Sequence, residues 1–132
     1  MIYLDTAALV KLVRREVESD ALVEWIAVRP EQLLVSSALA EVELPRALRR
    51  TEPALVAGVP ALLGRIAIYE IDDLVRTTAA AYTDPQIRSL DAIHLATADA
   101  VLADDLTCFV TYDRRLLATA TALGLPTATP GC

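Results

Sequence analysis

The stretch IYLDTAALVKLV, residues 2–13, decides the fold class. Residues 2–4 are a short apolar run of the kind that forms a buried strand. Asp5 follows directly, and the apolar side chains over residues 7–14 then repeat at helical spacing. The stretch therefore predicts a strand followed at once by a helix, which is the opening of a βαβ unit.

The same alternation continues along the chain. Further strands are predicted at 33–35, 66–71, 108–111 and 126–129, and further helices at 20–27, 72–82, 90–102, 115–123 and from a cap at Ser36–Ser37 to residue 50. Residues 53–64 carry Gly58 and Pro60, which predict a broken helix or two short ones. We expect one α/β domain, residues 1–132, with a parallel sheet of four to five strands flanked by helices.

Composition narrows the class of protein. The 132 residues suit one domain, and 55% hydrophobic but only 5% aromatic residues predict an aliphatic core. No apolar run approaches the ~20 residues that span a bilayer, and no signal-peptide pattern opens the chain, so we expect a cytoplasmic protein without a membrane partner. Two cysteines and one histidine make neither a disulfide framework nor a recognisable zinc site.

Three acidic residues stand where burial is expensive. Asp5 and Asp113 each follow a predicted buried strand, and Asp91 lies in the first turn of an otherwise apolar helix. Burying a carboxylate is costly unless something pairs with it. Helix capping or turn formation would explain each acid singly. Because the carboxyl ends of parallel strands meet at one sheet edge, we expect the three to share a site there.

Carboxylates gathered in this way repel one another unless a cation lies between them. Oxygen donors without a cysteine or histidine cluster favour Mg²⁺, with Mn²⁺ as a substitute. A fourth acid would come from the helix after the second strand, where Glu41 and Glu43 lie about 200° apart around the axis. Spacing alone does not choose between them. Thr6 and Thr111 are candidates for orienting the carboxylates.

Four segments resemble the motifs of PIN-domain ribonucleases of the VapC toxin type. They are IYLDTAALVKL at 2–12, SALAEVELPRALRR at 37–50, LDAIHLATA at 90–98 and VTYDRRL at 110–116. The acid of the family's second motif stands three residues before an arginine, which implies Glu43 rather than Glu41. The resemblance thus implies that Asp5, Glu43, Asp91 and Asp113 are the catalytic and metal-binding residues.

The resemblance also implies a function. It is that of a Mg²⁺-dependent endoribonuclease, the toxin of a toxin–antitoxin pair, which hydrolyses RNA phosphodiester bonds with a metal-activated water. The implied partners are RNA, a VapB-like antitoxin and a second copy of the chain in a homodimer. The net charge of −6 argues at first against RNA. Bound cations would offset part of it, and nearly all basic residues are arginines, which suit phosphate.

Alternatives remain open at this level. The chain could be a PIN-fold binding module with little or no catalysis, or another Mg²⁺-dependent α/β phosphotransfer domain. A receiver domain would need a late lysine, but the only lysine is Lys11, and a haloacid-dehalogenase-like phosphatase would need an aspartate where Ala7 stands. His94 is either a general base or a packing and hydrogen-bonding residue. Pro45 predicts a kink in the helix that carries Glu43.

Overall fold

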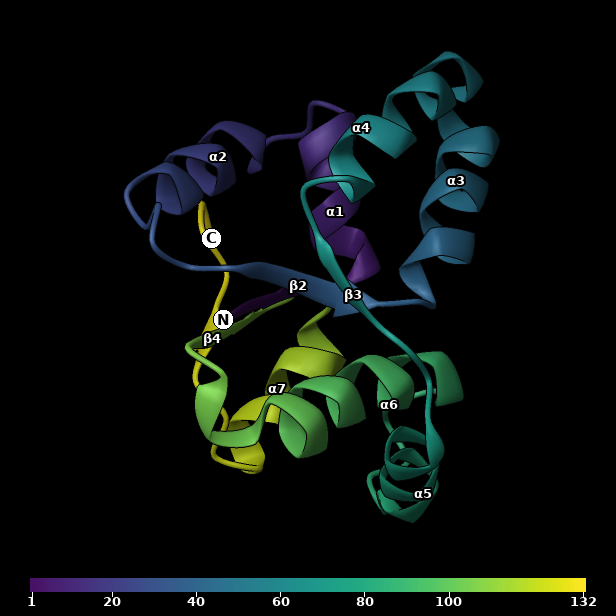
Figure 1. Cartoon of the computed structure of the whole chain (residues 1–132), viewed down its shortest axis with the longest axis vertical. Coiled ribbons are helices and arrows are strands. Elements are labelled where there is room, and N and C mark those ends of the chain that lie inside the picture. The colour runs from purple at the N-terminus through teal and green to yellow at the C-terminus, as the bar shows by residue number, and fades with distance from the viewer.

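A five-stranded parallel sheet forms the middle layer of the molecule (Figure 1). Its strands are β1 (Ile2–Leu4), β2 (Leu34–Ser37), β3 (Ala67–Tyr69), β4 (Cys108–Val110) and β5 (Thr127–Ala128), in the order β3-β2-β1-β4-β5. All four pairings are parallel. This computed structural model describes all 132 residues, and it confirms the predicted fold class.

Helices cover both faces of the sheet (Figure 1). On one side lie α1 (Thr6–Val13), α2 (Ser19–Ala27), α3 (Ala40–Thr51) and α4 (Val59–Leu63), and on the other lie α5 (Asp73–Ala81), α6 (Ser89–Ala96) and α7 (Arg114–Ala122). Short helical turns are η1 (Pro53–Gly58), η2 (Thr97–Leu102) and η3 (Ala103–Asp105). The broken helix predicted at 53–64 is thus two short ones. None of the helices has the length and apolar character that a membrane crossing requires.

The central strand β1 supplies both cores because its side chains alternate between the two faces. Ile2 and Leu4 are fully buried in the aliphatic core under α1 to α4. Tyr3 points to the opposite core, where its ring stacks on Phe109 with centroids 5.3 Å apart. Burying one large apolar side chain contributes about 1.5–3 kcal/mol, so this strand anchors the sheet between both helical layers.

Three predicted boundaries were wrong or incomplete. Ser36 and Ser37 end strand β2 rather than open a helix, and the Ser36 hydroxyl donates to the Leu4 carbonyl at 2.7 Å across the sheet. The helix predicted at 90–102 is α-helical only to residue 96 and continues as the wider π-helical turn η2. There the Thr97 hydroxyl donates to the Ile93 carbonyl at 2.8 Å, a bond that bends helices. The same helix begins one residue earlier than predicted, at Ser89, with Arg88 as its N-cap.

The strand order places a crevice at one edge of the sheet. The chain leaves β1 for β2 on one side, whereas β4 lies on the other side of β1. In open α/β sheets, ligands bind at the carboxyl ends of the strands where the order reverses in this way. Asp5 follows β1 and Asp113 lies just beyond β4, so both stand at this reversal.

Candidate functional site

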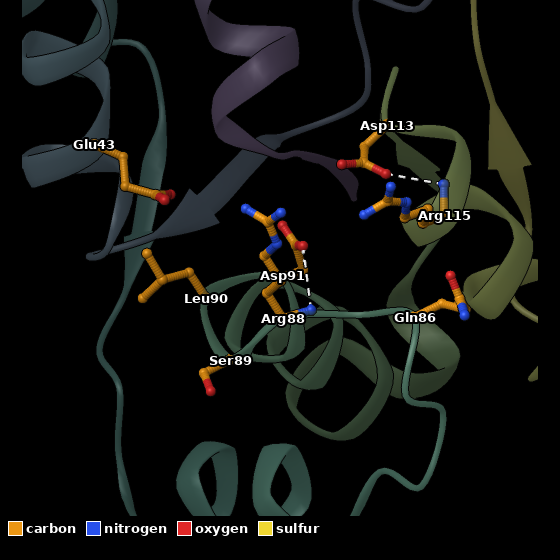
Figure 2. Close-up of a pocket in the computed structure, with 8 residues that line it drawn as sticks. All are labelled: Glu43, Gln86, Arg88, Ser89, Leu90, Asp91, Asp113 and Arg115. Carbon is orange, nitrogen blue, oxygen red and sulfur yellow. Dashed lines mark hydrogen bonds between the residues drawn. The ribbon is translucent and has the colours of Figure 1, made fainter.

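A cavity of about 590 Å³ opens next to this edge of the sheet. Figure 2 shows its lining side chains, which are Glu43, Gln86, Arg88, Ser89, Leu90, Asp91, Asp113 and Arg115. Glu43 comes from α3, Asp91 from α6 and Asp113 from the start of α7. Three of the four predicted acids therefore line one cavity, although they are 48 and 22 residues apart in sequence.

Asp5 is the fourth predicted acid, and it is buried beside the cavity rather than lining it. Its Oδ1 accepts the backbone N–H of Ala8 at 2.9 Å, which caps helix α1. Its Oδ2 accepts the hydroxyl of Thr111 at 2.5 Å. Burial raises the pKa of Asp5, and the negative charge of Asp113 adds to that rise, although His94 and the bonds from Thr111 and Ala8 act against it.

Asp113 and Asp91 each use one oxygen for the fold. Oδ1 of Asp113 accepts the backbone N–H groups of Arg115 at 2.9 Å and Leu116 at 3.1 Å, which caps α7. Oδ2 of Asp91 accepts the backbone N–H of Arg88 at 3.4 Å. Both acids therefore also stabilise the starts of their helices, as the capping explanation predicts. Oδ2 of Asp113 and Oδ1 of Asp91 make no hydrogen bond, so these two oxygens are open to a ligand.

Glu43 shows the same division between its two oxygens. Oε1 accepts the Thr6 hydroxyl at 2.6 Å and lies 2.8 Å from Nε2 of His94, whereas Oε2 has no hydrogen bond. Burial of the carboxylate opposes its ionisation, but the bonds from His94 and Thr6 outweigh it and lower the pKa of Glu43. Glu41 is exposed and makes no side-chain contact of this kind. Helix α3 runs through Pro45 without interruption.

The acids lining the cavity act on one another electrostatically. Burial raises the pKa of Asp91, and the negative charges of Asp113 and Glu43 raise it further. A cation between the carboxylates would relieve this repulsion. The donors are all oxygens, which is the ligand set of Mg²⁺ and Mn²⁺.

The spacing of these acids limits how an ion could sit. No group of three or more acidic, histidine or cysteine side chains is close enough to hold one metal ion directly. Mg²⁺ commonly takes only one or two carboxylates and keeps several of its waters. The residues therefore fit a hydrated Mg²⁺ that binds one or two of them and reaches the others through water.

Among the residues that prediction from sequence missed are Arg88, which lines the cavity, and Tyr3, which contacts His94. Arg88 lies two residues before the first residue of the third motif, and its side chain lines the cavity between Glu43 and Asp113 (Figure 2). Tyr3 lies on strand β1, and its hydroxyl is 2.6 Å from Nδ1 of His94. The only sequence signal for Arg88 is its place beside the motif. Tyr3 shows none, because its contact with His94 spans 91 residues.

Fold and site together define an α/β domain that gathers carboxylates where the strand order of a parallel sheet reverses. The PIN-domain family profile matches residues 2–122. The chain is 54% identical over 132 residues to ribonuclease VapC35 of Mycobacterium tuberculosis, covering 99% of this chain and 98% of that protein. It is 43% identical over 130 residues to ribonuclease VapC46 of the same organism, covering 98% and 97%. The chain belongs to the PIN-domain family, among its VapC-type members.

Solved structures agree on the fold. VapC20 of Mycobacterium tuberculosis, a sarcin-ricin loop cleaving toxin, superposes with a TM-score of 0.75 at 15% identity, covering 98% of this chain and all 100% of that one. VapBC2 of Rickettsia felis, bound to a DNA fragment from its promoter, gives a TM-score of 0.71 at 14% identity, with 97% and 98% covered. At such identities the likeness concerns the fold alone.

Proposed function

We propose that this chain is a Mg²⁺-dependent endoribonuclease and the toxin of a toxin–antitoxin pair. The observation that carries the proposal is the cavity itself. Three carboxylates line it, each with one oxygen free of hydrogen bonds, and two arginines stand beside them. The relatives named as ribonucleases align over nearly the full length of the chain, which supports the choice of RNA as substrate.

The four acids would divide the work of holding the ion. Glu43, Asp91 and Asp113 offer the free oxygens, and Asp5 contributes a buried charge whose orientation Thr111 holds. A bound Mg²⁺ would supply an acidified water as nucleophile and a positive charge opposite the phosphate, and Mn²⁺ would serve in its place. The chain's own part is to fix these carboxylates on rigid helix starts before RNA arrives.

The two cavity arginines would bind the RNA backbone. Arg88 and Arg115 line the cavity, and neither forms a salt bridge with an acid. The planar guanidinium group matches two phosphate oxygens at once. An RNA phosphate bound by the two arginines would be held next to the acids and their cation, which would set the position of the scissile bond.

An apolar surface next to α1 and α4 suits the antitoxin. Two cavities of about 370 and 190 Å³ adjoin there, and both are lined by Leu12, Leu62 and Arg65. An amphipathic segment that buries apolar side chains and aims an acid at Arg65 would fit this groove. The VapBC2 neighbour from Rickettsia felis is a toxin–antitoxin complex by name, which supports such a partner. A homodimer of this chain belongs to the same proposal.

The catalytic unit in this proposal is the whole chain, residues 1–132. The family match ends at residue 122. Strand β5 lies beyond that point and still pairs with β4 through Phe109↔Thr127 and Val110↔Ala128. The last residues therefore complete the sheet that carries Asp5 and Asp113.

One observation favours the alternative of a binding module with little catalysis, namely that no three acids converge directly on one metal position. Cleavage of defined tRNAs and rRNA fragments by the purified chain separates the two. The nuclease proposal predicts cleavage with Mg²⁺ or Mn²⁺, loss of it in excess chelator, and loss of it in Asp91→Asn. Cleavage that persists equally in the chelator and in Asp91→Asn would come from another source and would refute the proposal.

A further inference from the structure

A buried chain of hydrogen bonds leads from strand β1 to the cavity. Tyr3 and His94 are 0% and 3% exposed. The Tyr3 hydroxyl lies 2.6 Å from Nδ1 of His94, and Nε2 of the same ring lies 2.8 Å from Oε1 of Glu43. The Thr6 hydroxyl donates to that oxygen too, at 2.6 Å. Two donors therefore converge on one oxygen of Glu43 and none on the other.

The protons in this chain can be placed from the chemistry of its groups. An ionised carboxylate only accepts hydrogen bonds, so Nε2 of His94 must carry the proton that points at Glu43. In a neutral ring Nδ1 is then the acceptor, and the Tyr3 hydroxyl must donate to it. The Tyr3 hydroxyl is buried, and a tyrosine hydroxyl ordinarily ionises only near pH 10, so it keeps its proton at neutral pH.

We propose that Tyr3 and His94 are positioning residues that hold Oε1 of Glu43, so that Glu43 serves the cavity through Oε2 alone. The Tyr3 hydroxyl donates to Nδ1 and so reinforces the Nε2–H form of the ring that the Glu43 carboxylate requires. His94 is then not the general base, because its only free lone pair is occupied by Tyr3. The role of Oε2 toward a cation rests on the proposed function, whereas the proton arrangement does not.

The arrangement also accounts for which glutamate on α3 serves the site. Glu43 is 25% exposed and meets two fixed donors, whereas Glu41 is exposed and meets none. Hydrogen bonds to a charged group are stronger than those between neutral groups, and two of them outweigh the rotamer entropy that the Glu43 side chain loses when it is held in one place. Glu43 is therefore held in place before any cation or RNA binds.

The proton arrangement can be read directly, because His94 is the only histidine in the chain. Nitrogen-15 NMR of the imidazole at pH 8, above the ordinary histidine pKa of about 6.5, reports which ring nitrogen carries a proton. We expect Nε2–H alone in the full chain, and in Tyr3→Phe a shifted Nδ1 resonance, because that nitrogen loses its hydrogen-bond donor. A ring protonated at Nδ1 or at both nitrogens would overturn the proposal, as would an unchanged spectrum in Tyr3→Phe.

A pair of amide variants tests the effect on the site. The side-chain nitrogen of His94→Gln can stand where Nε2 stands, whereas that of His94→Asn reaches only the position of Nδ1. Binding of Mn²⁺, followed by electron paramagnetic resonance, should weaken about tenfold in His94→Asn, in the range for groups that orient metal ligands. It should stay within about threefold of the original chain in His94→Gln, and Glu41→Gln is the matched control on α3.

The outcomes separate the two proposals. Equal weakening in His94→Gln and His94→Asn would show that the ring is needed only for packing, and would overturn the positioning role. Unchanged binding in His94→Asn would overturn it as well. Failure of the unaltered chain to bind Mn²⁺ would instead refute the proposed function, while the NMR result would still decide the proton arrangement.

Discussion

Replacing Asp5 separates its structural role from its proposed role in the site. Its carboxylate caps α1 through the backbone N–H of Ala8 and accepts the Thr111 hydroxyl with the other oxygen. Asp5→Ala removes both bonds. Asp5→Asn keeps an oxygen for Ala8 and presents an amide to the oxygen of Thr111, so it removes chiefly the charge.

The size of each effect follows from these contacts. Loss of the cap costs about 1 kcal/mol, and a buried Thr111 hydroxyl without its acceptor costs about 1–3 kcal/mol more. At pH 3, where the carboxyl group carries no charge and only the lost contacts count, Asp5→Ala should therefore lose about 2–4 kcal/mol of unfolding free energy. At about 4 °C per kcal/mol for a domain of this size, its Tm falls by roughly 8–16 °C.

Asp5→Asn should behave in the opposite way because the pKa of Asp5 is raised in the folded protein. A carboxyl group with a raised pKa binds more protons folded than unfolded. The original chain therefore loses stability as the pH rises from about 3.9, where aspartate ionises in the unfolded chain, through the raised pKa. Asp5→Asn has no such loss, so its Tm should exceed that of the original chain at pH 7 and lose this advantage at pH 3.

Circular dichroism melts at both pH values and RNA cleavage at pH 7 check these expectations together. Both Asp5 variants should lose cleavage, although one of them is more stable than the original chain. Cleavage by Asp5→Asn at the original rate would leave Asp5 as a helix cap only. A lower Tm for Asp5→Asn at pH 7 would contradict the electrostatic reasoning.

Three further predictions concern the metal, the RNA and the antitoxin. Mg²⁺ at about 100 times its Kd should stabilise the chain by about 2.7 kcal/mol, which a thermal melt would show as a higher Tm. The Tm of Asp91→Asn should not rise in this way, and an equal shift in both chains would place the ion elsewhere. In the Asp91→Asn background, Arg88→Ala should weaken RNA binding measured by fluorescence anisotropy. It should also reduce the slope of the logarithm of the binding constant against the logarithm of the salt concentration by about 1. An unchanged slope would show that Arg88 does not contact phosphate. Ala61 is exposed and lines the apolar groove. Ala61→Arg should therefore abolish co-elution with the antitoxin from a gel-filtration column while leaving RNA cleavage intact. An intact complex would place the antitoxin on another surface.

The fold could be predicted from sequence wherever the spacing of apolar residues alone decided the secondary structure. Short apolar runs marked four of the strands, and their alternation with amphipathic helices left only a parallel sheet flanked by helices. Prediction from this spacing failed where side-chain hydrogen bonds, rather than the local pattern of apolar residues, decided the secondary structure. Ser36 looks like a helix cap but lies in strand β2, because its hydroxyl bonds to a carbonyl 32 residues away. The π-helical turn η2 has no counterpart in the apolar spacing.

The candidate site was predictable to a similar extent. Asp5 and Asp113 follow strands, so topology alone places them at one edge of the sheet. Helical spacing could not choose between Glu41 and Glu43, because the donors that hold Glu43 come from α1 and α6. The same limit hid Tyr3, whose partner His94 is distant in sequence. Contacts between remote elements decide such details, and the local pattern does not report them.

The central claim is that Asp5, Glu43, Asp91 and Asp113 serve one divalent cation beside the carboxyl edge of the sheet. Anomalous diffraction from crystals grown with Mn²⁺ tests it most directly. The account predicts a peak in the cavity about 2.0–2.2 Å from an oxygen of at least one of these acids, with the others reached through water. Mn²⁺ bound only elsewhere on the molecule, with this cavity free of anomalous signal, would contradict it.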